Sequence, residues 1–285
     1  MLDLGKPDRL IVAMTTYNFK SIFSWNIFLY SGFAVVLIAY MWTMLDREVN
    51  KYSKYIGTFA FGWRIILTTG TGSIFGFLVA REAYATAILA PLFIVMSLLY
   101  GTAVYFLILK IISKFHETYI SDEILMNLRR LTIMFLFANL YFLFLYHITN
   151  MYIAKHLEYE IFILLDGGVY TYAFWIGQLL IGIIVPIFLI NSQKICKELS
   201  LIVSSVLILL GSFVAMYVII IAGQAYPLNI FPDHVIIESS FYDNTVHAYI
   251  PSIYELGLGL GGVALALIIV LIGVANFKFL PTIIK

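Results

Sequence analysis

Two polar side chains, His147 and Asn150, interrupt a long apolar stretch of the chain at a spacing of one helical turn. Histidine can exchange a proton near neutral pH, and an amide both donates and accepts hydrogen bonds. Such a pair could bind the oxygens of a hydroxyl-carbonyl ligand and accept its proton. Alternatively, His147 is a packing residue whose ring nitrogens are satisfied by its neighbours, and the sequence leaves both interpretations open.

Arg64 is the centre of a second polar stretch and follows Lys54 by ten residues. At about 1.5 Å per residue, this spacing places Arg64 near the middle of a membrane span. Thr68 and Thr71 follow at i+4 and i+7, so the three side chains share a helix face. An arginine at that depth normally faces a bundle interior, water or an anionic partner. Arg64 therefore either lines a hydrated path or polar pocket, or bonds carbonyl groups of neighbouring helices.

The composition indicates which elements position these groups. Hydrophobic residues make up 62% of the chain and charged residues 12%, and the mean hydropathy is +0.97. These values are typical of an integral membrane protein rather than a soluble domain. Apolar stretches long enough to cross a bilayer lie at about 20–45, 54–80, 86–112, 127–154, 168–191, 197–224 and 253–277. They are too long for membrane strands, so we predict an all-α polytopic bundle of about seven transmembrane helices.

The basic residues predict the orientation of this bundle, which we take as one membrane domain over residues 1–285. Alternate loops divide the 17 Lys and Arg residues eleven to five, with Arg64 inside a helix. The positive-inside rule then places the N-terminal segment 1–19 and the long loop 225–252 outside, and the tail 278–285 in the cytoplasm of a prokaryotic cell. Lipid is therefore one predicted partner of the chain.

Cofactors that need several cysteines or histidines are not predicted for this chain. Its single cysteine, Cys196, cannot by itself bind a zinc ion or an iron–sulfur cluster. A bis-histidine haem needs two membrane histidines, and only His147 of the five histidines lies in a predicted span. Near-neutral net charge without a basic patch gives no indication of nucleic-acid binding.

Several short motifs occur in a consistent order from Asp3 to Pro281. An Asp-Leu-Gly-Lys-Pro-Asp-Arg segment at 3–9 precedes a helix headed by Trp25, and later helices carry Phe-Trp-Ile-Gly at 174–177 and Gly-Gln-Ala-Tyr-Pro at 223–227. The order and spacing resemble the NrfD, or polysulphide reductase, membrane-subunit family. The positions that carry this resemblance are Asp3, Gly5, Pro7, Arg9, Trp25, Trp175, Pro186, Gln224, Pro251 and Glu255. Trp25 can also be read simply as an interfacial anchor.

The resemblance implies a function in electron transport during anaerobic respiration. Family members are quinone- or quinol-binding membrane subunits of multi-subunit oxidoreductases, which implies a quinone of the menaquinone type here. They exchange electrons with a ferredoxin-like iron–sulfur subunit on the outer face, which connects to a molybdopterin, hydrogenase or multihaem subunit. The chain would thus be a quinone-reactive or non-catalytic subunit. The family also has two or three membrane helices before the Asp3 motif, and these are expected to be missing here.

Particular residues follow from the same resemblance. A tyrosine that bonds the quinone in polysulphide reductase subunits would fall near Gly70, where Thr69 or Thr71 would have to supply the hydroxyl group. The full set of expected quinone contacts is Thr69, Thr71, Arg81, Tyr84, His147 and Asn150, and the expected proton path is Arg64, Glu82 and Asp166.

A secondary transporter or channel is the alternative from a different class. Arg64 and the glycine-rich segments could line a substrate path. Transporters often carry internal repeats, and no convincing repeat relates the two halves of this sequence.

Overall fold

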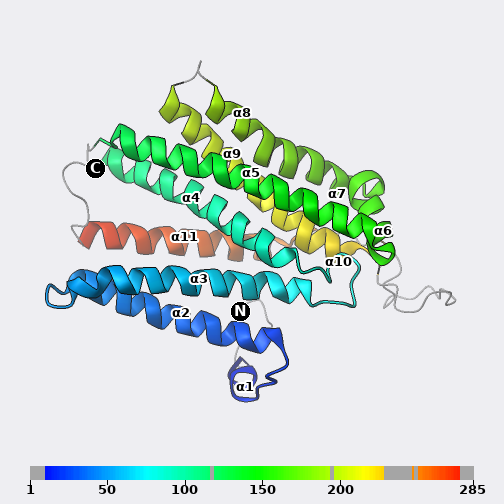
Figure 1. Cartoon of the computed structure of the whole chain (residues 1–285), viewed down its shortest axis with the longest axis horizontal. Helices are drawn as coiled ribbons and strands as arrows, with labels where there is room; N and C mark the ends of the chain where they lie inside the picture. Colours follow the sequence, from blue (N-terminus) through cyan, green and yellow to red (C-terminus); the bar gives the residue numbers. More distant parts are fainter. Residues whose placement is uncertain (1–9, 116–118, 193–195, 228–245, 247–249, 277–285) are drawn as a thin grey trace. The chain divides into compact units, whose positions relative to one another are not determined.

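In the computed structural model of the chain, the described residues are 10–115, 119–192, 196–227, 246 and 250–276. Every element in this part of the chain is a helix, which confirms the predicted all-α fold class. The first six α-helices are α1 (Leu10–Thr15), α2 (Ile22–Leu45), α3 (Ser53–Gly76), α4 (Leu89–Phe115), α5 (Asp122–Tyr152) and α6 (Ala154–Ile161) (Figure 1). A 3₁₀ turn, η2 (Asn50–Tyr52), joins α2 to α3.

The second half of the chain mixes α-helical and π-helical segments. A π-helical turn, η3 (Phe162–Asp166), follows α6 and leads to one continuous rod formed by α7 (Val169–Tyr172), η4 (Ala173–Ile184) and α8 (Val185–Asn191). A second rod joins α9 (Lys197–Met216), η5 (Tyr217–Ala222) and α10 (Gly223–Ala225), and α11 (Ile253–Asn276) is the last described helix. The segments η4 and η5 are π-helical, a form that occurs in proteins mostly as single-turn bulges.

Six helices in the described residues are long and apolar enough to cross a membrane. They are α2, α4, α5, the rods 169–191 and 197–225, and α11 over residues 253–273. The remaining predicted span, 54–80, forms the 24-residue helix α3 but does not reach the hydropathy of the other six. Its threonines, glycines and Arg64 lower that hydropathy, so the seventh crossing remains a prediction.

Backbone contacts divide the chain into two compact units. The first unit contains residues 1–98 and 137–160, and the second contains 99–136 and 161–285. That these two units form one membrane domain stays a prediction.

In the first unit, α2 and α3 form a hairpin. Trp63 of α3 donates from Nε1 to the carbonyl oxygen of Leu29 of α2 at 3.0 Å. A Cβ atom on Gly32 would lie 2.5 Å from the Trp63 ring, so glycine makes room for the indole. The core of this unit includes Leu67, Tyr84 and Leu89, all nearly or fully buried.

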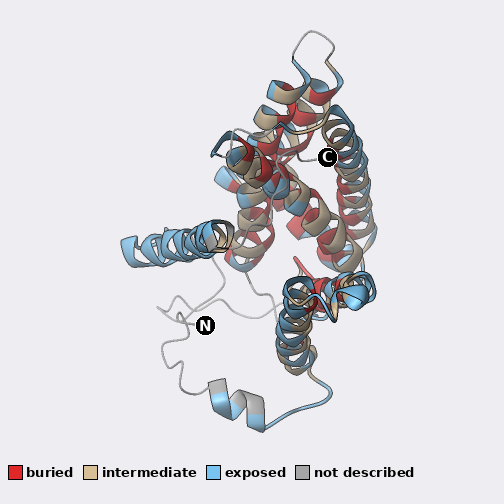
Figure 2. Ribbon diagram, turned by 90° about the vertical axis from the view of Figure 1, so that its left-hand side faces the viewer, coloured by how far each residue is buried: buried red, intermediate tan, exposed pale blue. Residues whose placement is uncertain are grey.

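In the second unit, the two rods pack closely through glycines. A Cβ atom on Gly211 of α9 would lie 2.2 Å from the Cα atom of Gly182 of η4. By contrast, none of residues 253–273 of α11 is buried and nearly all are exposed, so the helix is mostly pale blue in Figure 2. An apolar helix with exposed side chains is suited to contact with lipid or with neighbouring membrane helices.

Candidate functional site

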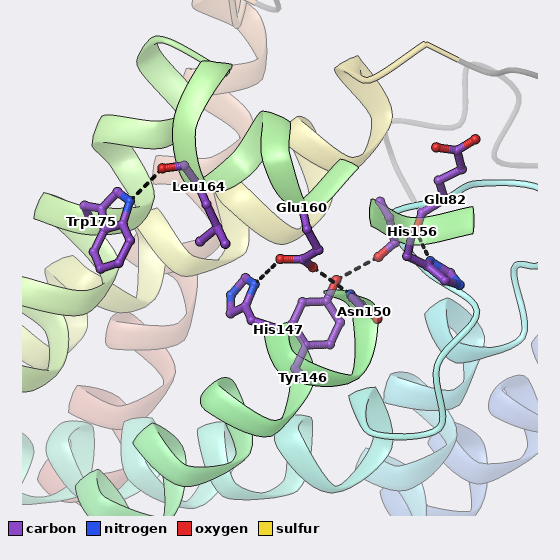
Figure 3. Close-up of polar contacts among 9 residues, drawn as sticks. Glu82, Tyr146, His147, Asn150, His156, Glu160, Leu164 and Trp175 are labelled. Atoms are coloured by element: carbon purple, nitrogen blue, oxygen red, sulfur yellow. Dashed lines mark hydrogen bonds and ion pairs between the residues drawn. The ribbon is translucent and has the colours of Figure 1, made fainter. Parts of the chain in front are cut away.

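A buried polar cluster lies where α5 meets α6 in the first unit. We call His147, Asn150 and Glu160 the His147 cluster. His147 Nδ1 lies 2.6 Å from Glu160 Oε2, and Asn150 Nδ2 donates to Glu160 Oε1 at 2.9 Å (Figure 3). The relative exposure of Glu160 is 0% and that of His147 is 9%. The carboxyl group therefore has a hydrogen-bonding partner on each oxygen and no contact with solvent.

The local sequence explains how this cluster forms. His147 and Asn150 share a face of α5 because they are three residues apart. The chain bends at Ile153, between the end of α5 and the start of α6. His156, Tyr159 and Glu160 then occupy the buried face of the short amphipathic helix α6. The bend returns Glu160 to the polar face of α5.

The loop between α3 and α4, residues 77–88, is fixed against the same corner. Tyr146 donates from its hydroxyl group to the carbonyl oxygen of Ala83 at 2.7 Å. Lys155 Nζ donates to the carbonyl oxygen of Val79 at 2.9 Å, and His156 Nδ1 bonds the carbonyl oxygen of Glu82. Three side chains of α5 and α6 thus position the loop.

One residue of the same loop, Ala85, has a backbone conformation that is unfavourable for a residue with a side chain. Ala85 has a φ angle of 63°, in the left-handed region that suits glycine. Such a residue persists when its surroundings determine the backbone. The three bonds from α5 and α6 to residues 79–83 are the constraints of that kind on this loop.

Burial changes the acidity of groups on the loop and on α6. Desolvation, followed by the charge of Glu158, raises the pKa of Glu82. Burial raises the pKa of the Tyr84 phenol to about 12 although Arg81 opposes the shift, and burial raises the pKa of Tyr159 well above its ordinary value. The two phenols therefore stay protonated near neutral pH and remain hydrogen-bond donors.

The His147 cluster contains one hydrogen-bond acceptor that its own side chains leave unused. Asn150 Oδ1 is buried and has no hydrogen-bond partner among the described residues. A buried acceptor of this kind is costly unless a water or a ligand donates to it. An imidazole beside a carboxyl group is also a combination that can accept or release a proton.

The expected quinone contacts are only partly brought together. His147 and Asn150 lie in the cluster, while Arg81 and Tyr84 belong to the loop fixed against it. Thr69 and Thr71 of α3 donate instead to the carbonyl oxygens of Ile65 and Leu67, at 2.8 and 3.0 Å. Thr71 also lies 3.4 Å from the hydroxyl group of Tyr30.

The expected proton-path residues are dispersed. Glu82 is half-buried on the loop, and its side chain is directed away from Glu160 in Figure 3. Arg64 is exposed, with its guanidinium carbon 5.5 Å from the centre of the Phe33 ring. Asp166 is exposed at the end of η3, in the second unit. Their role in proton movement remains a prediction.

Four of the motif positions, Asp3, Gly5, Pro7 and Arg9, lie outside the described residues. Trp25 donates to the carbonyl oxygen of Phe19 at 2.9 Å, and Trp175 donates to that of Leu164 at 3.0 Å. Pro186 is buried in the first turn of α8, and Gln224 is exposed in α10. These contacts support structural roles at helix ends.

Pro251 precedes α11, whose first turn contains Glu255. Glu255 Oε2 accepts from the backbone N–H of Ser252 at 2.6 Å, and the Ser252 hydroxyl accepts from the N–H of Glu255 at 3.3 Å. This reciprocal pair is a capping box. The last two motif residues therefore mark the start of a helix.

Sequence analysis did not identify Glu160, Tyr146, His156 or Tyr159. A signal was nevertheless present, because His156, Tyr159 and Glu160 follow i, i+3, i+4 spacing directly after an apolar span. That spacing predicts one face of a short helix. Within the described ranges, no group of three or more His, Cys, Asp or Glu residues could hold a metal ion.

The helical elements define the chain as a polytopic integral membrane protein. The profile of the family described as "Polysulphide reductase, NrfD" matches residues 1–227. The chain therefore belongs to the NrfD family, as its motifs predicted.

Two curated relatives match over most of the chain. One is the Hdr-like menaquinol oxidoreductase integral membrane subunit of Archaeoglobus fulgidus, 27% identical over 283 residues that cover 98% of this chain and 71% of that protein. The other is a selenate reductase subunit of Mesobacillus selenatarsenatis, 22% identical over 265 residues, which cover 80% of this chain and 62% of that protein. Both are described as subunits of oxidoreductases.

Proposed function

We propose that this chain is a quinone- or quinol-binding membrane subunit of a multi-subunit respiratory oxidoreductase. The observation that carries this proposal is the buried His147 cluster, which places a carboxyl group, an imidazole and an amide at one end of an apolar helix. The relative from Archaeoglobus fulgidus, described as a menaquinol oxidoreductase subunit, supports a quinol of the menaquinone type.

The residues present fit the head group of such a ligand. A quinol supplies two electrons and two protons when it is oxidised. Asn150 Oδ1, the buried acceptor without a partner among the described residues, would accept a hydrogen bond from a hydroxyl group. Asn150 Nδ2 holds the Glu160 carboxyl group in place while the His147–Glu160 pair takes up a proton.

The loop 77–88 would form the outer wall of this site. Tyr84 remains a hydrogen-bond donor because burial raises the pKa of its phenol to about 12, and Arg81 is close enough to affect that pKa. Glu82, whose pKa is also raised, would release protons at the outer surface. Thr69 and Thr71 are proposed as further contacts, Asp166 as a further proton carrier, and Arg64 as the deep charged group that supports the proton path.

Electron transfer needs a partner, because we expect this chain to hold no haem or iron–sulfur cluster. We propose a ferredoxin-like iron–sulfur subunit on the outer face, connected to a molybdopterin, hydrogenase or multihaem catalytic subunit. The description of both relatives as subunits supports an assembly of this kind. The transporter alternative needs Arg64 to line a substrate path. Arg64 instead lies exposed beside Phe33, which gives that alternative no support.

Binding of a fluorescent menaquinol analogue to the purified complex tests the proposal. A buried polar group left without its hydrogen-bond partner costs about 1–3 kcal/mol, so Glu160→Gln and His147→Ala, which both disrupt the cluster, should each weaken binding by roughly 5- to 100-fold. Asn139→Ala is the matched control, because Asn139 is a buried polar residue of α5 outside the cluster. Equal affinities for the wild type and both cluster variants would remove the His147 cluster from the quinol site.

A further inference from the structure

A surface pocket of about 670 Å³ lies at the turn between α2 and α3. We call it the hairpin pocket, and its lining residues are Tyr40, Asn50, Lys51, Ser53, Lys54, Gly57, Thr58 and Phe61. The lining includes two ammonium groups, an amide and three hydroxyl groups, and it includes no carboxylate. Every polar side chain in it can donate a hydrogen bond.

A second pocket of about 660 Å³ provides a direct comparison. Its lining also contains two lysines, Lys110 and Lys114, but they are balanced by Asp122 and Glu198. Lys110 forms a salt bridge with Glu198. The second pocket is therefore neutral overall, whereas the hairpin pocket has a formal charge of +2 and is complementary to an anion.

The side chains of the hairpin pocket leave its two positive charges uncompensated. Among the described residues, neither Lys51 nor Lys54 forms a salt bridge, and the Lys51 ammonium group lies 5.1 Å from the centre of the Tyr52 ring. Asn50 Nδ2 donates to the carbonyl oxygen of Thr43 at 3.1 Å, which ties the turn to the end of α2.

Gly57 lets the Tyr40 ring pack against α3 at the wall of the hairpin pocket. A Cβ atom at this position would lie 3.0 Å from Cε2 of Tyr40 and 3.5 Å from its hydroxyl oxygen. The missing side chain therefore leaves room for the phenol at the pocket wall. A larger residue at position 57 would push the Tyr40 ring from this wall without changing the charge.

The location of the hairpin pocket indicates which kind of anion it binds. The turn belongs to the side that collects most of the Lys and Arg residues, which the positive-inside rule assigns to the cytoplasm. Both helices carry exposed apolar side chains within about two helical turns of this turn, among them Ile38, Trp42 and Phe59. We propose that the hairpin pocket binds the phosphate head group of an anionic phospholipid, whose acyl chains lie along these residues.

Lipid titration of the intact complex in detergent tests this site. Native mass spectrometry would measure binding of short-chain phosphatidylglycerol, with phosphatidylcholine and inorganic phosphate as comparison ligands. Removing one lysine near an anionic lipid costs about 1 kcal/mol, or about fivefold in affinity, so Lys51→Gln/Lys54→Gln should weaken binding about 25-fold. Lys110→Gln/Lys114→Gln removes the same charge from the neutral pocket and should leave this binding event unchanged.

A second variant distinguishes the effect of the pocket's shape on lipid binding from the effect of its charge. Gly57→Val retains both lysines but displaces the Tyr40 ring at the pocket wall, and it should also abolish saturable phosphatidylglycerol binding. Equal losses in the two double-lysine variants would overturn the proposal, as would equal affinity for phosphatidylcholine. Full displacement of the lipid by an equal concentration of inorganic phosphate would show that the ligand is a soluble anion instead. The test is independent of the quinol site, because none of these residues lies in the His147 cluster.

Discussion

The hydroxyl group of Tyr146 links the membrane helix α5 to the loop that covers the candidate site. It donates to the carbonyl oxygen of Ala83, and both residues are buried. Tyr146→Phe leaves that carbonyl without its donor, so the free energy of unfolding should fall by about 1–3 kcal/mol. Denaturant titration in detergent measures the change. Tyr141→Phe, which alters an exposed tyrosine of the same helix, should stay within about 0.5 kcal/mol of the wild type.

Glu82 gives the loop a pH-dependent stability. Its pKa is raised in the folded state, chiefly by desolvation, so the folded protein favours the protonated carboxyl group. The stability from this preference is present below the unfolded pKa, about 4.3, and is lost as the pH rises through the folded pKa. Glu82→Gln should therefore match the wild type near pH 4 and become the more thermostable protein at pH 7.

Thermal unfolding at a series of pH values checks this prediction. Glu158 is the second cause of the shift, so in a Glu158→Gln background the thermostability that Glu82→Gln gains at pH 7 should be smaller. If the difference in thermostability between Glu82→Gln and the wild type shrinks as the pH rises, the pKa of Glu82 is not raised in the folded protein.

At the residue scale, the sequence predicted one half of the candidate site. The spacing of His147 and Asn150 inside an apolar run was sufficient to select them, and both bond the same carboxyl group. Glu160 escaped prediction because it stands in the polar segment between the apolar stretches 127–154 and 168–191. The i, i+3, i+4 spacing of His156, Tyr159 and Glu160 predicts a helix face, but it does not predict the bend at Ile153 that turns this face toward α5.

At the scale of elements, two glycines control the packing of the rods in the second unit. Gly182 and Gly211 approach so closely that a Cβ atom on either would be within 3 Å of the other's Cα atom. Gly211→Val must push the rods apart, and we expect a loss of about 2–4 kcal/mol in unfolding free energy, the range of large packing defects. Unfolding in sodium dodecyl sulphate, followed by circular dichroism, would measure it.

Gly101 is the matched control for this prediction. No atom lies within 4 Å of a Cβ atom built on Gly101, and the residue is exposed on α4. Gly101→Val should therefore change stability by less than about 1 kcal/mol. Equal stability of the two valine variants would mean that the glycine contact does not hold the rods together.

Most of the long helices were predictable from the sequence, whereas the π-helical segments were not. Apolar length was enough to find six spans, because a bilayer requires about 20 apolar residues per helix. The π-helical segments η4 and η5 could not be predicted, since a wider helical turn depends on side-chain packing and backbone bonding rather than on an apolar period. The helix α3 was found as a helix, but its polar side chains leave its membrane crossing open.

At the scale of the whole molecule, cysteine labelling can determine on which side of the membrane each loop lies. Cys196 is the only cysteine of the chain and is exposed. If α3 crosses the membrane, an impermeant maleimide should reach Cys196 from the cytoplasmic side. In a Cys196→Ser background, Arg47→Cys should be labelled from that same side and Leu78→Cys from the outside. Labelling of positions 47 and 78 from one side would remove α3 from the membrane-crossing helices.

The central claim is that a quinol head group binds beside the His147 cluster. Photoaffinity labelling of native membranes with an azido-quinone, followed by mass spectrometry of the labelled peptides, tests it most directly. We predict that the label is found on peptides from residues 139–161 or 77–88, and that a menaquinol analogue competes for it. Labels confined to α9 and α11, or labels that the analogue does not displace, would contradict the claim.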